Sequence, residues 1–158
     1  MIRNILQEIN AAATMAVKNA LEEAEMPALM LAKEVYEEIP RPSAKVIFGD
    51  TTAVVYTKGV AERTCEIIAV WNAPDVVEYK LDCLMAQQVI EDYIMAHGLV
   101  LEDGRILFVD EIRSSIANAC VMMRFSVTAY AAIESGEDNG GDSGEPMEHL
   151  DITTNTEE

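Results

Sequence analysis

A long stretch of alternating side chains, from Cys120 to Ile133, is the feature that most constrains how this chain can fold. Its odd-numbered members are all apolar, whereas several of the even-numbered members are polar. Successive side chains of a strand point to opposite faces, so this period predicts one long strand with a covered face. We expect a central or long edge strand, paired antiparallel with a strand over Ile106–Ile112, with residues 113–118 as the connecting loop.

The N-terminal third of the chain predicts one helix and one short strand. Apolar residues recur at three- and four-residue steps over Ile2–Glu23, which is the spacing of an amphipathic helix. Residues 28–38 fit either a continuation of this helix or the opening of a strand. A short strand is then expected over Ala44–Phe48, closed by a turn at Gly49-Asp50. The loop expected to follow contains Thr51, Thr52 and Gly59.

The middle of the chain predicts a second strand followed by a second helix. The stretch Glu62–Trp71 alternates, and its second face becomes apolar only toward the end, as in a strand that is covered on both sides there. Asp75 is expected to cap a helix that runs from Val76 to about Ala96 and stops at Gly98. The predicted apolar ridge of this helix is Tyr79, Cys83, Ala86, Ile90, Tyr93 and Ile94, widened by Leu81, Leu84 and Met85.

These elements together predict an α+β fold. The order is helix, strand, strand, helix, strand, strand, which favours a two-layer domain with a mainly antiparallel sheet packed by the N-terminal helix and the long central helix. The domain is expected to span residues 1–133. Residues 134–158 carry nine acidic residues, no basic residue and few large apolar ones. Such a composition predicts a disordered acidic C-terminal segment, because it cannot offset the entropy lost on ordering.

The charge of the chain narrows its function. Asp and Glu total 28 against 11 Lys and Arg, which gives a formal net charge of −17. General nucleic-acid binding is therefore not expected, because phosphate contacts require clustered Lys and Arg. The chain also lacks a run of about 18 apolar residues, so no membrane span is expected. Polar residues interrupt the apolar positions of the N-terminus, which argues against a signal peptide.

The sequence predicts no catalytic, cofactor-binding or metal-binding residues, and therefore no enzyme. Cys65, Cys83 and Cys120 are far apart, without a CxxC pair, and are expected to be small buried hydrophobes made in a reducing cytosol. His97 and His149 stand far from any cysteine. The carboxylates form runs without a base, nucleophile or ligand at a fixed spacing, so we expect solvated faces. These runs are Glu22, Glu23 and Glu25, then Glu37 and Glu38, then Asp110 and Glu111.

Two features leave alternatives open. Met122 lies on the polar side of the Cys120–Ile133 alternation, together with Tyr130, and it indicates either a subunit contact or packing within the chain. The acidic segment is either a solvating peptide or a segment that orders against a partner. In the second case its anchors would be Met147, Leu150 and Ile152.

One run of residues resembles a known family. The stretch Glu38-Ile39-Pro40-Arg41-Pro42-Ser43-Ala44-Lys45-Val46 is similar to a segment found early in the tail terminator, or tail completion, proteins of phages and prophages of Gram-positive bacteria. The opening helix beginning Ile2-Arg3-Asn4-Ile5 fits the same family, as does the strand through Arg63 to Trp71 with its long helix. The pair Gly104–Ile112 and Ala119–Tyr130 fits as a closing hairpin. The resemblance covers about residues 1–133.

This resemblance implies a structural role in a virion. Proteins of this kind assemble into rings, commonly hexamers, at the head-proximal end of the tail tube, where they stop tube polymerisation and join the tail to the head connector. The implied partners are other copies of the chain, the tube protein, the connector and the sheath protein. The implied location is the virion tail, assembled in the bacterial host cytoplasm. DNA would pass through the ring lumen without specific binding, and a negative ring suits this role because it repels phosphate.

The family role predicts particular surfaces and leaves other functions open. A closed ring needs head-to-tail interfaces, for which the long strand and the first helix are expected to supply complementary edges. The nearest alternative is another virion ring component, such as a head–tail connector or a tube subunit. More distant alternatives are a small acidic enzyme and an acidic interaction module that uses residues 134–158.

Overall fold

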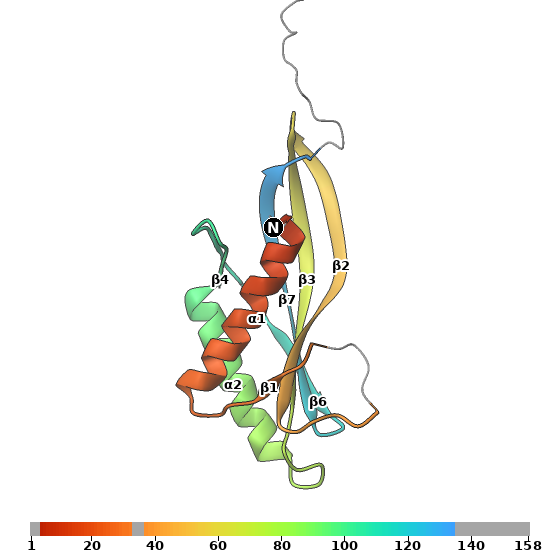
Figure 1. Ribbon diagram of the computed structural model, residues 1–158, viewed down its shortest axis with the longest axis vertical. Helices are drawn as coiled ribbons and strands as arrows, with labels where there is room; N and C mark the ends of the chain where they lie inside the picture. Colours follow the sequence, from red (N-terminus) through yellow and green to blue (C-terminus); the bar gives the residue numbers. More distant parts are fainter. Residues whose placement is uncertain (1–3, 33–36, 135–158) are drawn as a thin grey trace, which may run out of the picture.

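The computed structural model describes residues 4–32 and 37–134 and contains two helices and a five-stranded sheet (Figure 1). Within the described part of the chain the fold is α+β, as predicted. The main elements are α1 Ile5–Glu23, β2 Ser43–Thr57, β3 Val60–Asn72, α2 Lys80–His97 and β7 Cys120–Ala132. The shorter strands are β1 Leu29–Met30, β4 Leu99–Val100, β5 Ile106–Leu107 and β6 Arg113–Ala117.

The sheet has the order β1-β2-β3-β7-β6, in which only the β1–β2 pair is parallel. The prediction of a long strand at the end of the domain is confirmed, and β7 is central, between β3 and β6. Its apolar face is buried from Val121 to Ala129. The prediction for β3 is also confirmed, because its outer face becomes buried only at Ile68 and Val70. A separate hairpin joins β4 to β5.

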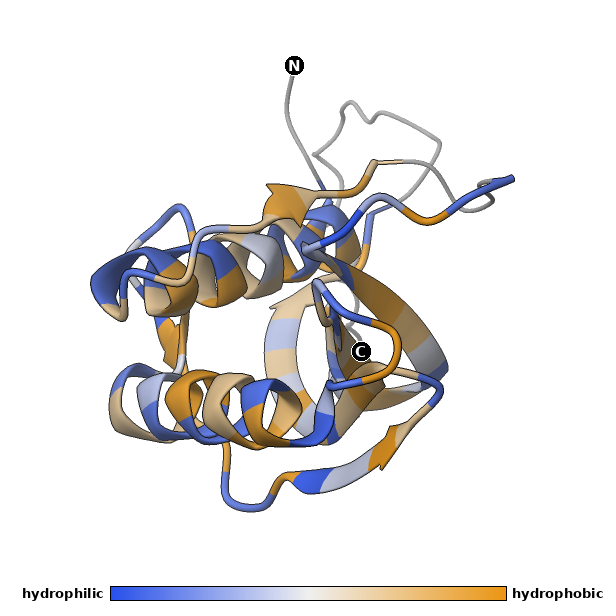
Figure 2. Ribbon diagram, turned by 90° about the horizontal axis from the view of Figure 1, so that it is seen from below, coloured by the Kyte–Doolittle hydropathy of each residue, from blue (hydrophilic) through white to orange (hydrophobic). Residues whose placement is uncertain are grey.

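Both helices pack against the same face of the sheet and against each other (Figure 2). α1 begins with a capping box, in which the Asn4 side chain accepts from the Gln7 amide and the Gln7 side chain accepts from the Asn4 amide. Its apolar stripe forms the core with the buried sides of α2, β3 and β7. The fully buried large side chains include Ile9, Leu21, Ile67, Ile90, Ile94, Leu99 and Met123.

The prediction that a strand ends at Gly49-Asp50 is wrong. β2 continues to Thr57, and the register against β3 shifts between Phe48 and Thr51, as in a β-bulge. A side chain at Gly49 would collide with the Glu66 carboxylate, whose Oε1 accepts a hydrogen bond of 3.4 Å from the Asp50 amide. The Gly-Asp pair therefore marks a bulge. The hairpin turn comes later, at Lys58-Gly59, where Gly59 has a φ of 82°.

The predicted pairing of residues 106–112 with the last strand is also wrong. Only Ile106 and Leu107 are in a strand, and they pair with β4. Residues 113–117, predicted as a loop, form β6 and pair with β7 through a tight turn at Asn118-Ala119, whose φ angles are 54° and 61°. Turns with two positive φ angles match the twist of a hairpin. β6 has polar residues on both faces, so its period was not visible in the sequence.

α2 starts later than the sequence predicts. Asp75 caps a turn, where its Oδ1 accepts from the Val77 and Glu78 amides at 2.8 and 3.2 Å, and the helix itself begins at Lys80. These bonds hold the pKa of Asp75 below its usual range. The predicted ridge packs inward, with Cys83, Ala86, Ile90 and Ile94 buried. The predicted widening of that ridge is wrong, because Leu81, Leu84 and Met85 are exposed.

Gly98 ends α2 as predicted, and its environment predicts a large effect of adding one methyl group. Its φ is 68°, and a Cβ would lie 2.8 Å from both Ile106 Cγ2 and the Leu107 carbonyl oxygen. We expect Gly98→Ala to lower the free energy of unfolding by about 2 kcal/mol, measured by urea denaturation. Gly59→Ala is the control, since Gly59 has a positive φ but open space around it. Equal losses in both variants would contradict the steric explanation.

The remaining predictions concern the connecting segments. Residues 29–30 form β1, which pairs in parallel with Ser43 and Ala44, so the helix does not continue there. The first three residues, residues 33–36 and nearly all of the acidic segment (135–158) lie outside the described residues. Over the described ranges, neither helix is long and apolar enough to cross a membrane.

Candidate assembly surfaces

Side-chain hydrogen bonds attach the Pro-Arg-Pro-Ser run to the base of the sheet, the end at which β2 begins and β3 ends. Arg41 Nη1 donates to the carbonyl oxygens of Ala73 and Ala119, at 2.8 and 3.1 Å. These carbonyls belong to the turn after β3 and to the turn before β7. Two residues later, buried Ser43 Oγ accepts a 3.0 Å bond from Asn72 Nδ2. The run therefore ties β2 to the ends of two neighbouring strands.

One exposed apolar surface lies at the hairpin end of the domain, where β2 and β3 project beyond α1 (Figure 1). The rings of Tyr56 and Tyr130 are in contact there, with centroids 4.8 Å apart. The Tyr130 hydroxyl donates a 2.8 Å bond to Glu62 Oε2, and this bond raises the pKa of Tyr130. We call the following set, which occupies both faces of the projecting strands, the hairpin-end surface: Val54, Tyr56 and Tyr130 on one face, Val55 on the other, and Ile133 just past β7.

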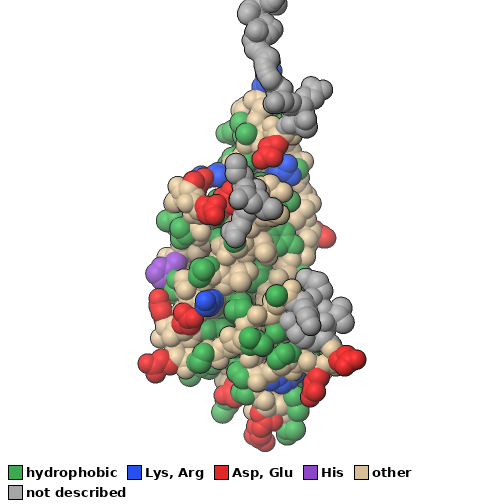
Figure 3. Space-filling model, in the orientation of Figure 1, with side chains coloured by type: hydrophobic (Ala, Val, Ile, Leu, Met, Phe, Trp, Pro, Cys, Tyr) green, Lys and Arg blue, Asp and Glu red, His purple; other side chains and the backbone are tan. Residues whose placement is uncertain are grey.

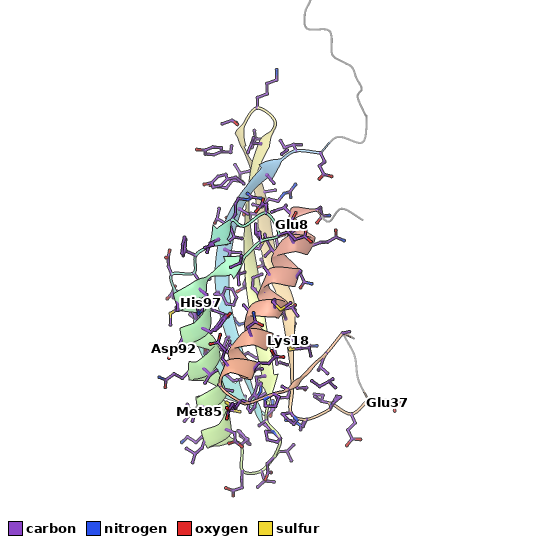
Figure 4. The ribbon with its side chains drawn as sticks, turned by 60° about the vertical axis from the view of Figure 1, so that its left-hand side comes forward. Glu8, Lys18, Glu37, Met85, Asp92 and His97 are labelled. Carbon is purple, nitrogen blue, oxygen red and sulfur yellow. The ribbon has the colours of Figure 1, made fainter. Side chains whose placement is uncertain are left out.

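A second exposed apolar surface lies at the opposite end, where α2 begins. Leu81 is 79% exposed and Val77 75%, although both are large apolar residues. Figure 4 shows Met85 near this end of α2, with Asp92 and His97 farther along the same helix. On the face drawn in Figure 3, hydrophobic side chains gather in the lower half, and acidic ones line the lower rim. We call this set the α2-start surface: Val76, Val77, Leu81, Leu84 and Met85.

A polar hollow of about 530 Å³ lies beside β7, past the end of β6. Ser126 and Thr128 of β7 line it. Charges of both signs surround it, with Arg113 Nε 3.2 Å from Glu111 Oε2 and Arg124 Nη1 3.9 Å from Glu66 Oε2. These pairs are largely solvated, so each contributes little to stability. The hollow therefore exposes the flank of β7 in a setting without a strong net charge.

The structure brings Cys83 and Cys120 close enough to interact electrostatically with each other and with Arg41, and it places the other residues singled out by the sequence elsewhere. Cys65 and Cys83 are buried and Cys120 is half-buried; all three are free thiols, and burial raises the pKa of each. The carboxylate runs are exposed, as predicted. His97 is exposed in the last turn of α2, against the Tyr93 ring. His149 lies outside the described residues.

Some features bear on the alternatives that the sequence left open. Met122 is half-buried on the outer face of the sheet, which leaves both interpretations of it standing. Within residues 4–32 and 37–134, no three His, Cys, Asp or Glu side chains gather as metal ligands would.

The hairpin-end surface was not predicted from the sequence. A signal for this surface is present in the sequence, because residues 51–57 (Thr-Thr-Ala-Val-Val-Tyr-Thr) are rich in strand-forming residues.

No protein-family model matches the chain, and no curated protein matches it significantly.

Proposed function

We propose that this protein is a ring-forming tail terminator of a phage or phage-derived particle. It sits at the head-proximal end of the tail tube, stops tube polymerisation and joins the tail to the head connector. The observation that carries the proposal is the Glu38–Val46 run, the most specific part of the resemblance. Arg41 within this run bonds two separate turns of the fold, which gives the run a defined structural purpose.

The distribution of exposed apolar side chains supports this role. The hairpin-end and α2-start surfaces lie at opposite ends of the long axis of the domain (Figure 1). Clustered apolar exposure is typical of surfaces that another protein covers. A terminator must contact the tube on one side and the connector on the other, so a subunit with apolar surfaces at both ends suits that position.

The charge of the chain supports the passage of DNA. With a formal net charge of −17, a ring of several copies repels phosphate, so the genome can slide through the lumen without sticking. In this proposal the ring lumen carries no base-reading or phosphate-binding site.

The test is microscopy of particles in which the protein carries a density label. We expect one ring of label at the junction between tail tube and head. Label along the whole tube would identify a tube subunit, and label only within the head portal would identify a connector. Either result would contradict the terminator role.

A further inference from the structure

The sheet has two open strand edges that face opposite ways. On one side, β1 pairs with β2 only at Ser43 and Ala44. On the other side, β6 pairs with β7 only as far as Arg124. Among the described residues, no strand pairs with the rest of β2, or with β7 from Phe125 onward, on the side away from β3. We define the β2 edge as residues 51–57 and the β7 edge as residues 125–132.

The β2 edge carries none of the protection that monomeric proteins give to exposed strands, whereas on the β7 edge the Arg105 side chain bonds the Tyr130 carbonyl. The β2 edge reads Thr-Thr-Ala-Val-Val-Tyr-Thr, and the β7 edge reads Phe-Ser-Val-Thr-Ala-Tyr-Ala-Ala, so neither holds a charge or a proline. All seven residues of the β2 edge are exposed. A long uncharged edge with unpaired backbone groups is a template for pairing with another chain. Such an edge is stable in solution when a partner strand covers it.

The hydrogen-bonding pattern shows which backbone groups each edge offers. Arg105 Nη1 donates to the Tyr130 carbonyl, so the even-numbered residues of β7 direct their backbone groups away from β3. The backbone groups of successive residues in a strand point alternately to the two neighbouring strands. When this alternation is followed through the registers of β7, β3 and β2, the residues of β2 that direct their backbone groups away from β3 between the bulge and Val55 are odd-numbered. The outward amides are therefore those of Thr51, Ala53 and Val55 on one edge, and of Ser126 and Thr128 on the other.

The two edges suit each other as partners. β2 and β7 are both antiparallel to β3, so they run in the same direction. Rotation about an axis along the strands brings the β2 edge of one copy beside the β7 edge of the next as a parallel pair. This contact is head-to-tail, and a head-to-tail contact that closes on itself makes a ring. The hollow between Ser126 and Thr128 on one side and Asp110, Glu111 and Arg113 on the other leaves space beside that flank of β7.

We propose that copies of this chain join by parallel pairing of the β2 edge of one subunit with the β7 edge of its neighbour, continuing the sheet around the ring. The occupant of each open edge is thus a second copy of the chain. This inference rests on the proposed ring-forming function and specifies its subunit interface. Hydrogen bonds along the backbone supply the pairing, and the side chains of the hairpin-end surface flank it.

Two proline variants test the pairing, with assembly measured by sedimentation velocity. Ala53→Pro and Thr128→Pro each remove one outward amide that the subunit does not use internally, and proline is tolerated on an edge strand at such positions. A proline removes a ladder hydrogen bond and its ring obstructs the approach of the partner strand, so we expect each variant to assemble about 100-fold more weakly and to be monomeric. Ala53→Ser and Thr128→Ser keep the amides and should assemble as the wild type does. Circular dichroism and cooperative unfolding verify the fold of each variant.

Mixing the two proline variants tests the head-to-tail geometry. Each variant keeps one intact edge, so an equimolar mixture should form a dimer of one copy of each and nothing larger. If Thr128→Pro assembles like the wild type while Ala53→Pro does not, the interface is β2 to β2 and the proposal is overturned. If Ala53→Pro still forms rings, edge pairing is overturned but the terminator role can still hold. If edge-paired rings form but are not found at the end of the tail, only the terminator role is overturned.

Hydrogen exchange on the wild-type assembly gives a second test that needs no variant. The amides of Ala53 and Val55 should exchange as slowly as those of Thr52 and Val54, which bond β3. Fast exchange at Ala53 and Val55 in the assembled protein would overturn the proposal. The wild-type protein could instead be monomeric, with slow exchange at these amides that is lost when residues 134–158 are removed. That result would mean that the acidic segment of the same chain covers the β2 edge, and it would also overturn the proposal.

Discussion

An Ile90→Ala variant is expected to lose about 3–4 kcal/mol of unfolding free energy. Ile90 is fully buried on α2, in the core that this helix shares with α1 and the sheet. Truncation removes its buried methyl groups and leaves a cavity, and buried Leu, Ile or Met to Ala changes cost 2–5 kcal/mol. The loss would be measured as a lower urea midpoint in chemical denaturation, with an unchanged m-value.

The matched control is Leu81→Ala on the same helix. Leu81 is exposed, so this change should alter the unfolding free energy by no more than about 0.5 kcal/mol. The pair also tests the corrected position of Leu81, which the sequence placed on the buried ridge. Equal destabilisation by the two substitutions would show that α2 packs through a different face.

An Arg41→Ala variant is expected to lose about 2–3 kcal/mol of unfolding free energy. The guanidinium donates to two carbonyl oxygens, and hydrogen bonds from a charged donor contribute about 1.5–3 kcal/mol each. Its removal also leaves the carbonyl of fully buried Ala73 without this donor. Thermal and urea unfolding would measure the loss.

Arg113→Ala is the control for Arg41. Its ion pair with Glu111 is mostly exposed, so its removal should change stability by less than about 0.5 kcal/mol. If Arg41→Ala is as stable as Arg113→Ala, the Pro-Arg-Pro-Ser run does not hold the base of the sheet. The structure would then give no reason why this chain keeps a run that resembles the terminator segment.

The sequence predicted the elements whose burial differs between two faces. The alternation at 120–133 identified β7, and the alternation at 62–71 identified β3, because one side of each strand packs on the helices. The ridge Cys83, Ala86, Ile90 and Ile94 identified the inward side of α2 for the same reason. In these places local pattern and tertiary packing agree.

The sequence failed where the local signal had two meanings. Gly49-Asp50 is typical of a turn, but here it forms a bulge beside Glu66, so β2 was predicted to be too short. Asp75 is typical of a helix cap, yet it caps a turn five residues before Lys80. The sequence of β6 shows no period because polar residues stand on both of its faces, although one face is exposed and the other is half-buried.

The candidate surfaces were largely invisible in the sequence. Leu81 and Met85 look like core residues, because an apolar side chain carries the same signal whether the chain itself or a partner covers it. The open edges depend on where β1 and β6 stop, which long-range pairing decides. The expectation that the long strand supplies an assembly edge stays a prediction, and β2 in place of the first helix is now the proposed complementary edge.

The length of tail tubes made without this protein tests the central claim most directly. Under the proposed terminator role, deletion of its gene should give tubes of variable, excessive length that do not join to filled heads, and a plasmid copy should restore both normal length and joining. Tubes of uniform, normal length that join to filled heads in the deletion strain would contradict the account.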